Sequence, residues 1–348
     1  MEIFMSKLTI LVLLLALFNT GESFAQKFIP STIYQLDQRF SHHVLVVEKS
    51  THTLYLYEYA QDVPKLIKTY QVATGKIKGD KLVQGDEKTP EGIYHFQNFR
   101  SSEDLIGQYG DETGKIYGAG AFTLNYPNEM DRRARKTGGG IWLHSTDDDA
   151  RVSKGLDSRG CVVAIDQDLK EISQYIDLSN TPAIIVQDLH FLSEQTWRSN
   201  KEEILQTVQN WMKAWQEKNF KTYIQQYSKS EFYDRRKGNW NDYRRYKKAV
   251  FSRKDSPIIK FRNLSILSNR GYVVVTMEQD YSSDVIDDIG KKTLYLKQDE
   301  NYEWKIVAEL FNKLEKKETI AFTPSMRFFN DKVSRSNAEE KKANAESI

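Results

Sequence analysis

The sequence predicts a two-domain α+β protein, in which a mostly β domain is followed by an α+β domain. Three observations support this prediction. The chain has 348 residues, of which 39% are apolar, and is long enough to form two modest cores. Short runs rich in β-branched and aromatic residues recur over residues 43–188. From residue 201 onward, a segment with helical apolar spacing precedes four strand-like runs.

The first 25 residues have the features of a signal peptide. Apolar residues run from Leu8 to Phe18, and small residues around Ala25 suit signal peptidase, so we expect the mature chain to begin near Gln26. An uncleaved membrane anchor is the alternative, but the run is shorter than the roughly 20 residues that span a bilayer. We therefore expect an exported protein located in the periplasm or cell envelope.

Residues 26–42 are expected to form a short helical segment, because Ile33, Leu36 and Phe40 recur at helix-like spacing. The first domain should then occupy residues 43–188. Its predicted strands are a hairpin over 43–59, followed by 65–73, 93–99 and 183–186.

Two groups of side chains in this domain resemble metal ligands but favour other interpretations. His42, His43 and His52 have no companion ligands at metal-site spacing, so they are better explained as surface or strand-edge residues. The three aspartates at 147–149 point in different directions if the segment is extended, which indicates a solvated loop. We expect neither a metal nor a cofactor.

Cys161, the only cysteine, follows Ser158-Arg159-Gly160 and lies 17 positions after His144, which ends a short apolar strand. A nucleophilic cysteine needs an imidazole that accepts its proton and backbone N–H groups that face the oxyanion. The separation leaves room for a loop, so the two side chains can meet. Gly160 permits close backbone approach, and the N–H of Cys161 is a candidate oxyanion donor. A buried structural cysteine is the alternative, but export favours a chemical role, because a lone thiol forms no internal disulfide.

This arrangement resembles the L,D-transpeptidase catalytic domain of the YkuD family, whose members remodel peptidoglycan. The sequence Thr-Pro-Glu-Gly at 89–92 resembles a second signature of that family. The resemblance implies that Cys161 is the nucleophile and His144 the general base and acid. The family usually has a glycine after the histidine and an arginine soon after the cysteine, where this chain has Ser145 and Val163-Ala164. Support for the oxyanion and the missing positive charge is assigned to Gly160, Ser158 and Arg159.

A basic cluster precedes the glycine loop at 138–140 and is expected to edge the cleft. Muropeptide stems carry carboxylates, which Lys115, Arg132, Arg133 or Arg135 would bind, and a solvated basic face is the alternative. The side chains selected as substrate-binding candidates are Trp142, Tyr126 and Arg132.

After a linker at 189–200, residues 201–320 resemble the SnoaL-like, nuclear transport factor two-like cone, which often serves as a binding or dimerising module. A homodimer is therefore one implied assembly. Lys and Arg outnumber Asp and Glu between Lys221 and Arg270 and alternate with aromatic residues. Because the net charge is only +2 and export is expected, we exclude nucleic acid and expect anionic wall polymers or peptidoglycan carboxylates, with a solvated face as the alternative. Residues 321–348 are expected to be a disordered tail.

Together, the two resemblances imply an exported peptidoglycan-remodelling cysteine enzyme that acts on stem tetrapeptides through a Cys161 thioester and releases D-alanine. Transfer of the acyl group to an amine, the L,D-transpeptidase reaction, is favoured. Two alternatives remain open at this point. One is a cell-shape-determining L,D-carboxypeptidase, which transfers the acyl group to water, and the other is a non-enzymatic wall-binding protein.

Overall fold

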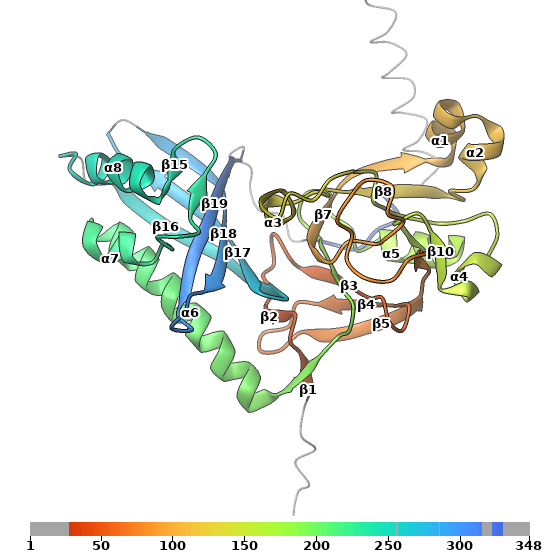
Figure 1. Cartoon of the computed structure of the whole chain (residues 1–348), viewed down its shortest axis with the longest axis horizontal. Helices are drawn as coiled ribbons and strands as arrows, with labels where there is room; N and C mark the ends of the chain where they lie inside the picture. Colours follow the sequence, from red (N-terminus) through yellow and green to blue (C-terminus); the bar gives the residue numbers. More distant parts are fainter. Residues whose placement is uncertain (1–27, 255–256, 285, 315–321, 330–348) are drawn as a thin grey trace, which may run out of the picture.

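The structure, a computed structural model, describes residues 28–254, 257–284, 286–314 and 322–329. Two domains lie side by side (Figure 1). The first is built on an eight-stranded mixed sheet with the strand order β11-β9-β8-β7-β12-β3-β4-β5. In chain order these strands are β3 (His43–Glu48), β4 (Thr53–Glu58), β5 (Lys65–Gln71), β7 (Gly92–Ser101), β8 (Gly120–Leu124), β9 (Trp142–His144), β11 (Val162–Val163) and β12 (Pro182–Val186). The strands that the sequence predicts between residues 43 and 186 lie within this sheet.

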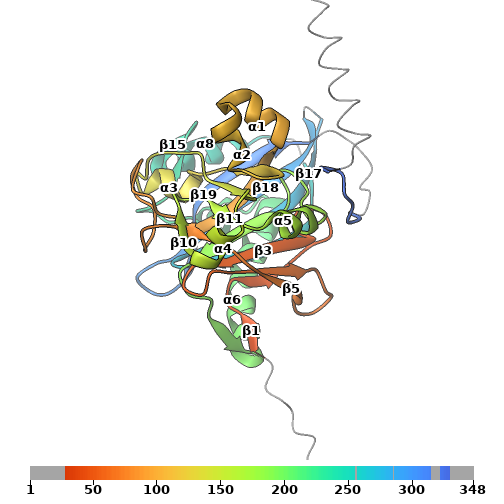
Figure 2. The same ribbon diagram turned by 90° about the vertical axis from the view of Figure 1, so that its right-hand side faces the viewer.

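Shorter elements surround the sheet. Strands β6 (Thr74–Gly75) and β10 (Leu156–Ser158) form a separate parallel pair. Figure 2 shows α4 and β10 on the side of the first domain that faces away from the second. The helices of this domain are α1 (Ser102–Tyr109), α2 (Asp111–Lys115), α3 (Glu129–Arg133), α4 (Ala150–Lys154) and α5 (Asp166–Ser173).

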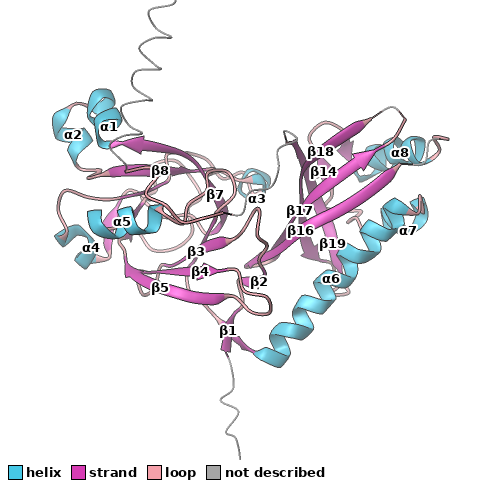
Figure 3. Ribbon diagram, turned by 180° about the vertical axis from the view of Figure 1, so that it is seen from behind, coloured by secondary structure: helices cyan, strands magenta, loops and turns pink. Residues whose placement is uncertain are grey.

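The second domain is a five-stranded antiparallel sheet in the order β19-β18-β17-β16-β2, with helices covering one face (Figure 3). Its long strands are β16 (Ile258–Asn269), β17 (Tyr272–Ser282), β18 (Asp287–Gln298) and β19 (Trp304–Lys313). The helices are α6 (Glu194–Gln216), α7 (Phe220–Gln225) and α8 (Trp240–Phe251), and a small hairpin consists of β14 (Tyr233–Asp234) and β15 (Gly238–Asn239). Trp197 and Trp211 on α6 are fully buried, which explains the helical apolar spacing. The predicted α+β fold class is confirmed.

The two domains share an apolar core. Val46 on β3 and Ile184 on β12 belong to the same buried cluster as Leu267 on β16 and Val274 on β17. Every residue of β3 and β12 is buried, because one face of these strands packs inside the first domain and the other against the second. The hydrogen bonds that cross the boundary include those from the Ile93 N–H to the Tyr272 hydroxyl and from Asn269 Nδ2 to the Ile185 carbonyl, each 3.1 Å long.

The predicted helix over residues 26–42 is wrong. The described part of this segment contains β1 (Phe28–Pro30) and β2 (Ile33–Gln35). Strand β2 pairs with β16 and becomes an edge strand of the second sheet, so long-range pairing overrides the local helical spacing.

The predicted linker over residues 189–200 is also wrong for most of its length. Strand β13 (Phe191–Ser193) pairs with β1, and α6 begins at Glu194. Ser193 caps this helix by accepting a hydrogen bond from the Thr196 N–H, a local signal that the apolar pattern alone does not reveal.

The predicted disordered tail is wrong for residues 322–329. Phe328 packs against Phe99 and Phe122 of the first domain, and Phe322 stacks on His42 at a centroid distance of 3.7 Å. Residues 330–348 and the predicted signal peptide at 1–25 lie outside the described residues. Within the described part of the chain, no helix is long and apolar enough to cross a membrane.

Candidate active site

Cys161 and His144 lie on neighbouring parallel strands at one edge of the first sheet. Strand β11 pairs with β9 so that Val162 faces Leu143 and Val163 faces His144. Cys161 directly precedes β11 and is therefore level with Trp142. Because side chains alternate between the faces of a strand, Cys161 and His144 point to the same face as diagonal neighbours. The structure thus brings together the two residues that the sequence singles out.

The loop before Cys161 is held by the buried side chain of Ser158. Its hydroxyl donates to the Cys161 carbonyl at 2.6 Å and accepts from the Gly160 N–H at 3.1 Å. Gly160 has φ +124°, and a Cβ there would lie 2.8 Å from the Lys88 carbonyl oxygen, so only glycine fits. The Cys161 N–H has no hydrogen-bond partner among the described residues and is free to face an oxyanion.

His144 is buried, and its Nδ1 lies 2.5 Å from the Ser145 carbonyl oxygen. A carbonyl only accepts, so Nδ1 carries the proton and Nε2 is left as the acceptor. The ring of Tyr117 packs edge-on against the imidazole at 5.0 Å. Burial lowers the pKa of His144 to about 4, so the imidazole is neutral near pH 7 and able to accept a proton.

Cys161 is half-buried, and its Sγ–H points to the Gly140 carbonyl oxygen at 3.5 Å. Burial raises the pKa of the Cys161 thiol to about 11, although the Trp142 N–H and the charges of Arg151 and Arg159 act in the opposite direction. The resting pair is therefore a neutral thiol and a neutral imidazole. Such a pair can carry out nucleophilic attack only if the base removes the thiol proton during the reaction.

Two arginines place positive charge near the thiol. Arg159, two residues before Cys161, is exposed, and its charge opposes the effect of burial on the pKa of the thiol. Arg151, which the sequence analysis missed, is held by Asp157 at 2.6 Å and donates to the Ile116 carbonyl and the Thr146 hydroxyl. Its charge contributes to the lowered pKa of His144 and partly offsets the burial that raises the pKa of Cys161. The sequence feature that could have indicated Arg151 is its place as a cation in the segment between His144 and Cys161.

An aromatic cluster flanks the pair. Trp142 packs on Tyr117 at 5.2 Å and on Tyr109 at 6.4 Å, and the Arg100 guanidinium lies over the Trp142 ring. Trp142, a substrate-binding candidate from the sequence, is level with Cys161 on the neighbouring strand, whereas Tyr109, Tyr117 and Arg100 were not among the candidates. Tyr109 ends one short helix and Tyr117 follows another, which is a weak signal without the fold. A partly exposed aromatic wall of this kind suits an extended peptide.

The other substrate-binding candidates make different contacts. Tyr126 is buried and donates its hydroxyl to the Thr137 carbonyl, so it supports the glycine loop from the core. Arg132 binds the Pro127 carbonyl and Glu129. Arg133 reaches the carbonyls of Glu231 and Tyr233 in the second domain, and Lys115 pairs with Asp111.

The three histidines considered as metal ligands make other contacts. His42 and His43 lie with their Nδ1 atoms 2.7 Å apart, and His42 Nε2 is 3.8 Å from Asp177. His52 contacts the Thr74 hydroxyl at 3.2 Å. Among the described residues, no three His, Cys, Asp or Glu side chains are grouped to hold a metal ion.

The basic surface of the second domain is smaller than its sequence suggests. Lys247 is buried, and Glu309 lies near both Lys247 and Lys292, while accepting hydrogen bonds from Tyr227 and Tyr243. Arg235 pairs with Glu129 of the first domain at 2.7 Å. Arg236, Lys237, Arg244 and Lys248 are exposed and form no ion pair among the described residues, and the same holds for Lys221, Lys229, Arg253, Lys254, Lys260 and Arg270.

A groove of about 1500 Å³ lies on the same domain, far in the fold from Cys161. It runs between α6, α7 and the turn that joins β18 to β19. Its lining mixes lysines with more numerous carboxylates and amides and with the aromatic rings of Trp240, Tyr302 and Trp304. This groove therefore does not extend the basic surface.

Comparisons with known proteins agree with both domains. Residues 42–185 match the family model of the L,D-transpeptidase catalytic domain (YkuD), and residues 203–310 match that of the Cds6 C-terminal NTF2-like domain. The structure is similar to that of Bd1075 from Bdellovibrio bacteriovorus, with 29% identity, a TM-score of 0.72 and coverage of 84% of this chain and 100% of the other. It is also similar to the helical cell shape determining protein Pgp2 from Campylobacter jejuni, with 26% identity, a TM-score of 0.63 and coverage of 80% and 95%. No curated protein matches the chain in sequence.

Proposed function

Because the chain carries an L,D-transpeptidase catalytic domain of the YkuD family followed by an NTF2-like domain, we propose that it remodels peptidoglycan by acyl transfer through Cys161. The proposed donor is a stem tetrapeptide, and the leaving group is its terminal D-alanine. The observation that supports this proposal is the placement of Cys161 and His144 on one face of adjacent strands, with a free N–H at Cys161.

The proposed reaction begins with two neutral groups. His144 Nε2 accepts the proton of the Cys161 thiol as Sγ attacks the carbonyl carbon of the third, L-centre residue. The carbonyl oxygen becomes an oxyanion that faces the Cys161 N–H. When the intermediate collapses, the bond to the D-alanine nitrogen breaks, and His144 returns the proton to that amine. A thioester on Cys161 remains.

The acceptor decides the name of the reaction. If an amine of a second stem attacks the thioester, with His144 as base, the enzyme is an L,D-transpeptidase, which we favour as the primary assignment. If water attacks, the product is a tripeptide and the enzyme is an L,D-carboxypeptidase. Similarity to a cell shape determining protein over both domains supports this second candidate.

Mass spectrometry of muropeptides treated with the purified full-length chain tests the proposal. New crosslinks between the third residues of two stems indicate transfer, and tripeptides with free D-alanine indicate hydrolysis. Neither product from the wild-type chain would reject the enzyme proposal and favour a non-enzymatic wall-binding protein.

We further propose that the protein acts in the cell envelope and that the second domain holds the wall through exposed cations that include Arg236, Lys237, Arg244 and Lys248. Changing all four to Glu should weaken binding to purified sacculi and make the remaining binding less dependent on salt. Turnover of a soluble muropeptide should be retained. Unaltered sacculus binding would identify these cations as a solvated surface only.

A further inference from the structure

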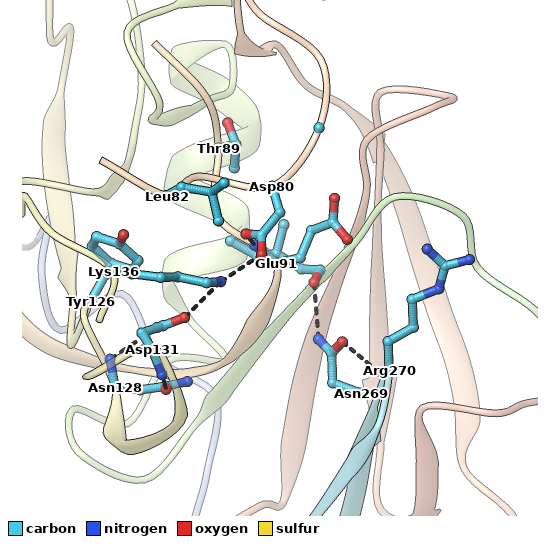
Figure 4. Close-up of polar contacts among 12 residues, drawn as sticks. Asp80, Leu82, Thr89, Glu91, Tyr126, Asn128, Asp131, Lys136, Asn269 and Arg270 are labelled. Atoms are coloured by element: carbon cyan, nitrogen blue, oxygen red, sulfur yellow. Dashed lines mark hydrogen bonds and ion pairs between the residues drawn. The ribbon is translucent and has the colours of Figure 1, made fainter. Parts of the chain in front are cut away.

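Lys136 is a buried cation between two carboxylates. Its Nζ lies 2.6 Å from Asp80 Oδ2 and 3.0 Å from Asp131 Oδ1, and only 9% of its side chain is exposed (Figure 4). Burial alone lowers the pKa of Lys136, but the bonds to Asp80 and Asp131 outweigh it and raise the pKa. The charge is therefore kept, and it joins two segments that are far apart in the sequence.

On one side, this contact fixes the glycine loop at residues 138–140. The next residue, Thr137, donates its N–H to the Leu82 carbonyl at 2.9 Å and accepts from the Gln84 N–H at 3.1 Å. Gly138 has φ +94° and packs close to the Gln84 Cα, so the loop lies directly on the segment that contains Asp80. The loop ends at Gly140, whose carbonyl accepts the Cys161 Sγ–H.

The second carboxylate partner of Lys136, Asp131, belongs to α3, and this helix contacts the second domain. Asp131 and Asn128 form a reciprocal capping box at the start of this helix. Glu129, the first residue of α3, pairs with Arg235 at 2.7 Å, and Arg133 at its last position reaches the carbonyls of Glu231 and Tyr233. A continuous series of polar contacts thus leads from the second domain through Lys136 to the glycine loop beside the thiol.

We propose that Lys136 is a positioning residue, which holds the Gly140 carbonyl against Cys161, and that the second domain supports this contact through the Arg235–Glu129 ion pair. Lys136 has no direct role in the chemistry. The inference rests on the proposed function only where turnover is measured, because the reactivity of the thiol can be measured without substrate.

The test compares Lys136→Met, Lys136→Arg and Arg235→Met in the full-length chain. Matched controls are Lys65→Met and Lys213→Met, which remove exposed lysines that each form one ion pair, with Glu58 and Glu217. Folding is checked by circular dichroism and thermal melting. The readouts are the rate of Cys161 alkylation by iodoacetamide between pH 6 and 10, and kcat and KM for D-alanine release from a soluble tetrapeptide muropeptide.

In Lys136→Met, the thiol should lose its carbonyl acceptor and become more exposed, so alkylation at pH 7 should rise about threefold. Loss of alignment should lower kcat by about tenfold to a hundredfold, with KM changed by less than about twofold. Lys136→Arg should restore most of both values. Arg235→Met should shift both in the same direction by a smaller factor.

A folded Lys136→Met that matches Lys65→Met in alkylation and kcat would overturn the positioning role. If Lys136→Met does not fold, the alkylation rates and kcat values of Arg235→Met and Lys136→Arg test the proposal instead. A wild-type alkylation rate in Arg235→Met would refute the coupling between the domains. If the wild-type chain releases no D-alanine and forms no crosslink, the proposed function fails, while the alkylation rates still test the positioning role.

Discussion

Replacing Ser158 with alanine removes the side chain that organises the Cys161 loop. The Ser158 hydroxyl is buried and makes two hydrogen bonds, one to the Cys161 carbonyl and one from the Gly160 N–H. Neither backbone group has another hydrogen-bond partner among the described residues. Ser158→Ala therefore leaves an unpaired donor and an unpaired acceptor, both close to the reacting sulfur.

The expected cost follows from these two groups. A hydrogen bond contributes about 1 kcal/mol net, and a buried group left without a partner costs about 1 to 3 kcal/mol. We expect Ser158→Ala to lower the free energy of unfolding by about 2 to 4 kcal/mol. Because the Cys161 backbone would no longer be fixed, kcat should fall by about tenfold to a hundredfold even where the protein is fully folded.

Ser173→Ala is the matched control. Ser173 is also buried, and its hydroxyl makes one hydrogen bond, to the Lys170 carbonyl on α5 at 2.7 Å. Urea unfolding and D-alanine release are measured for both variants. Ser173→Ala should lose about 1 kcal/mol of stability and keep its turnover. If Ser158→Ala keeps wild-type kcat, or if both variants lose turnover equally, the assigned role of Ser158 is refuted.

Three further predictions concern the pair of neutral groups. His144→Ala should reduce turnover by about two to four orders of magnitude, and wild-type turnover would show that His144 is not the base. Because the pKa of the Cys161 thiol is about 11, its alkylation rate should rise about tenfold per pH unit between pH 7 and 10, and a plateau near pH 7 would contradict a neutral resting thiol. Burial lowers the pKa of His144 from 6.5 to about 4, so its neutral form contributes stability above pH 6.5 that is lost as the pH falls toward 4. This loss of stability amounts to at most about 3 kcal/mol. The stability of His144→Gln should therefore fall less than that of the wild type between pH 6.5 and 4.

The whole chain is needed for these measurements because the domains are not independent. Val44 and Ile93 are buried in a cluster with Tyr272 and Val307 of the second domain. Removing the second domain would expose this apolar surface to water, which disfavours the folded state of the first domain. A truncated chain would therefore report on a disturbed sheet.

Much of the first domain could be predicted from local sequence. Its central strands are continuous runs of mainly β-branched and aliphatic residues. Such a run is the pattern expected of a strand that is buried on both faces. The placement of His144 and Cys161 on neighbouring segments was also predictable, because a strand end, a loop and a glycine-preceded cysteine are all local features.

Long-range contacts account for what the sequence did not reveal. Strand β2 forms only because β16 offers an edge, more than 200 residues away in the chain. Phe328 packs on Phe99 of the first domain, and the composition of the segment around Phe328 does not indicate that contact. Lys136 looks like one of several surface cations, and only the fold places Asp80 and Asp131 around it.

The most direct test of the central claim is to trap the acyl-enzyme. The wild-type chain is mixed with a tetrapeptide muropeptide, quenched rapidly in acid and measured by intact-protein mass spectrometry, followed by digestion to locate the adduct. We predict an added mass equal to the substrate minus D-alanine on the peptide that contains Cys161, and no adduct or turnover with Cys161→Ala. Release of D-alanine by folded Cys161→Ala, or an adduct at another residue, would contradict the account.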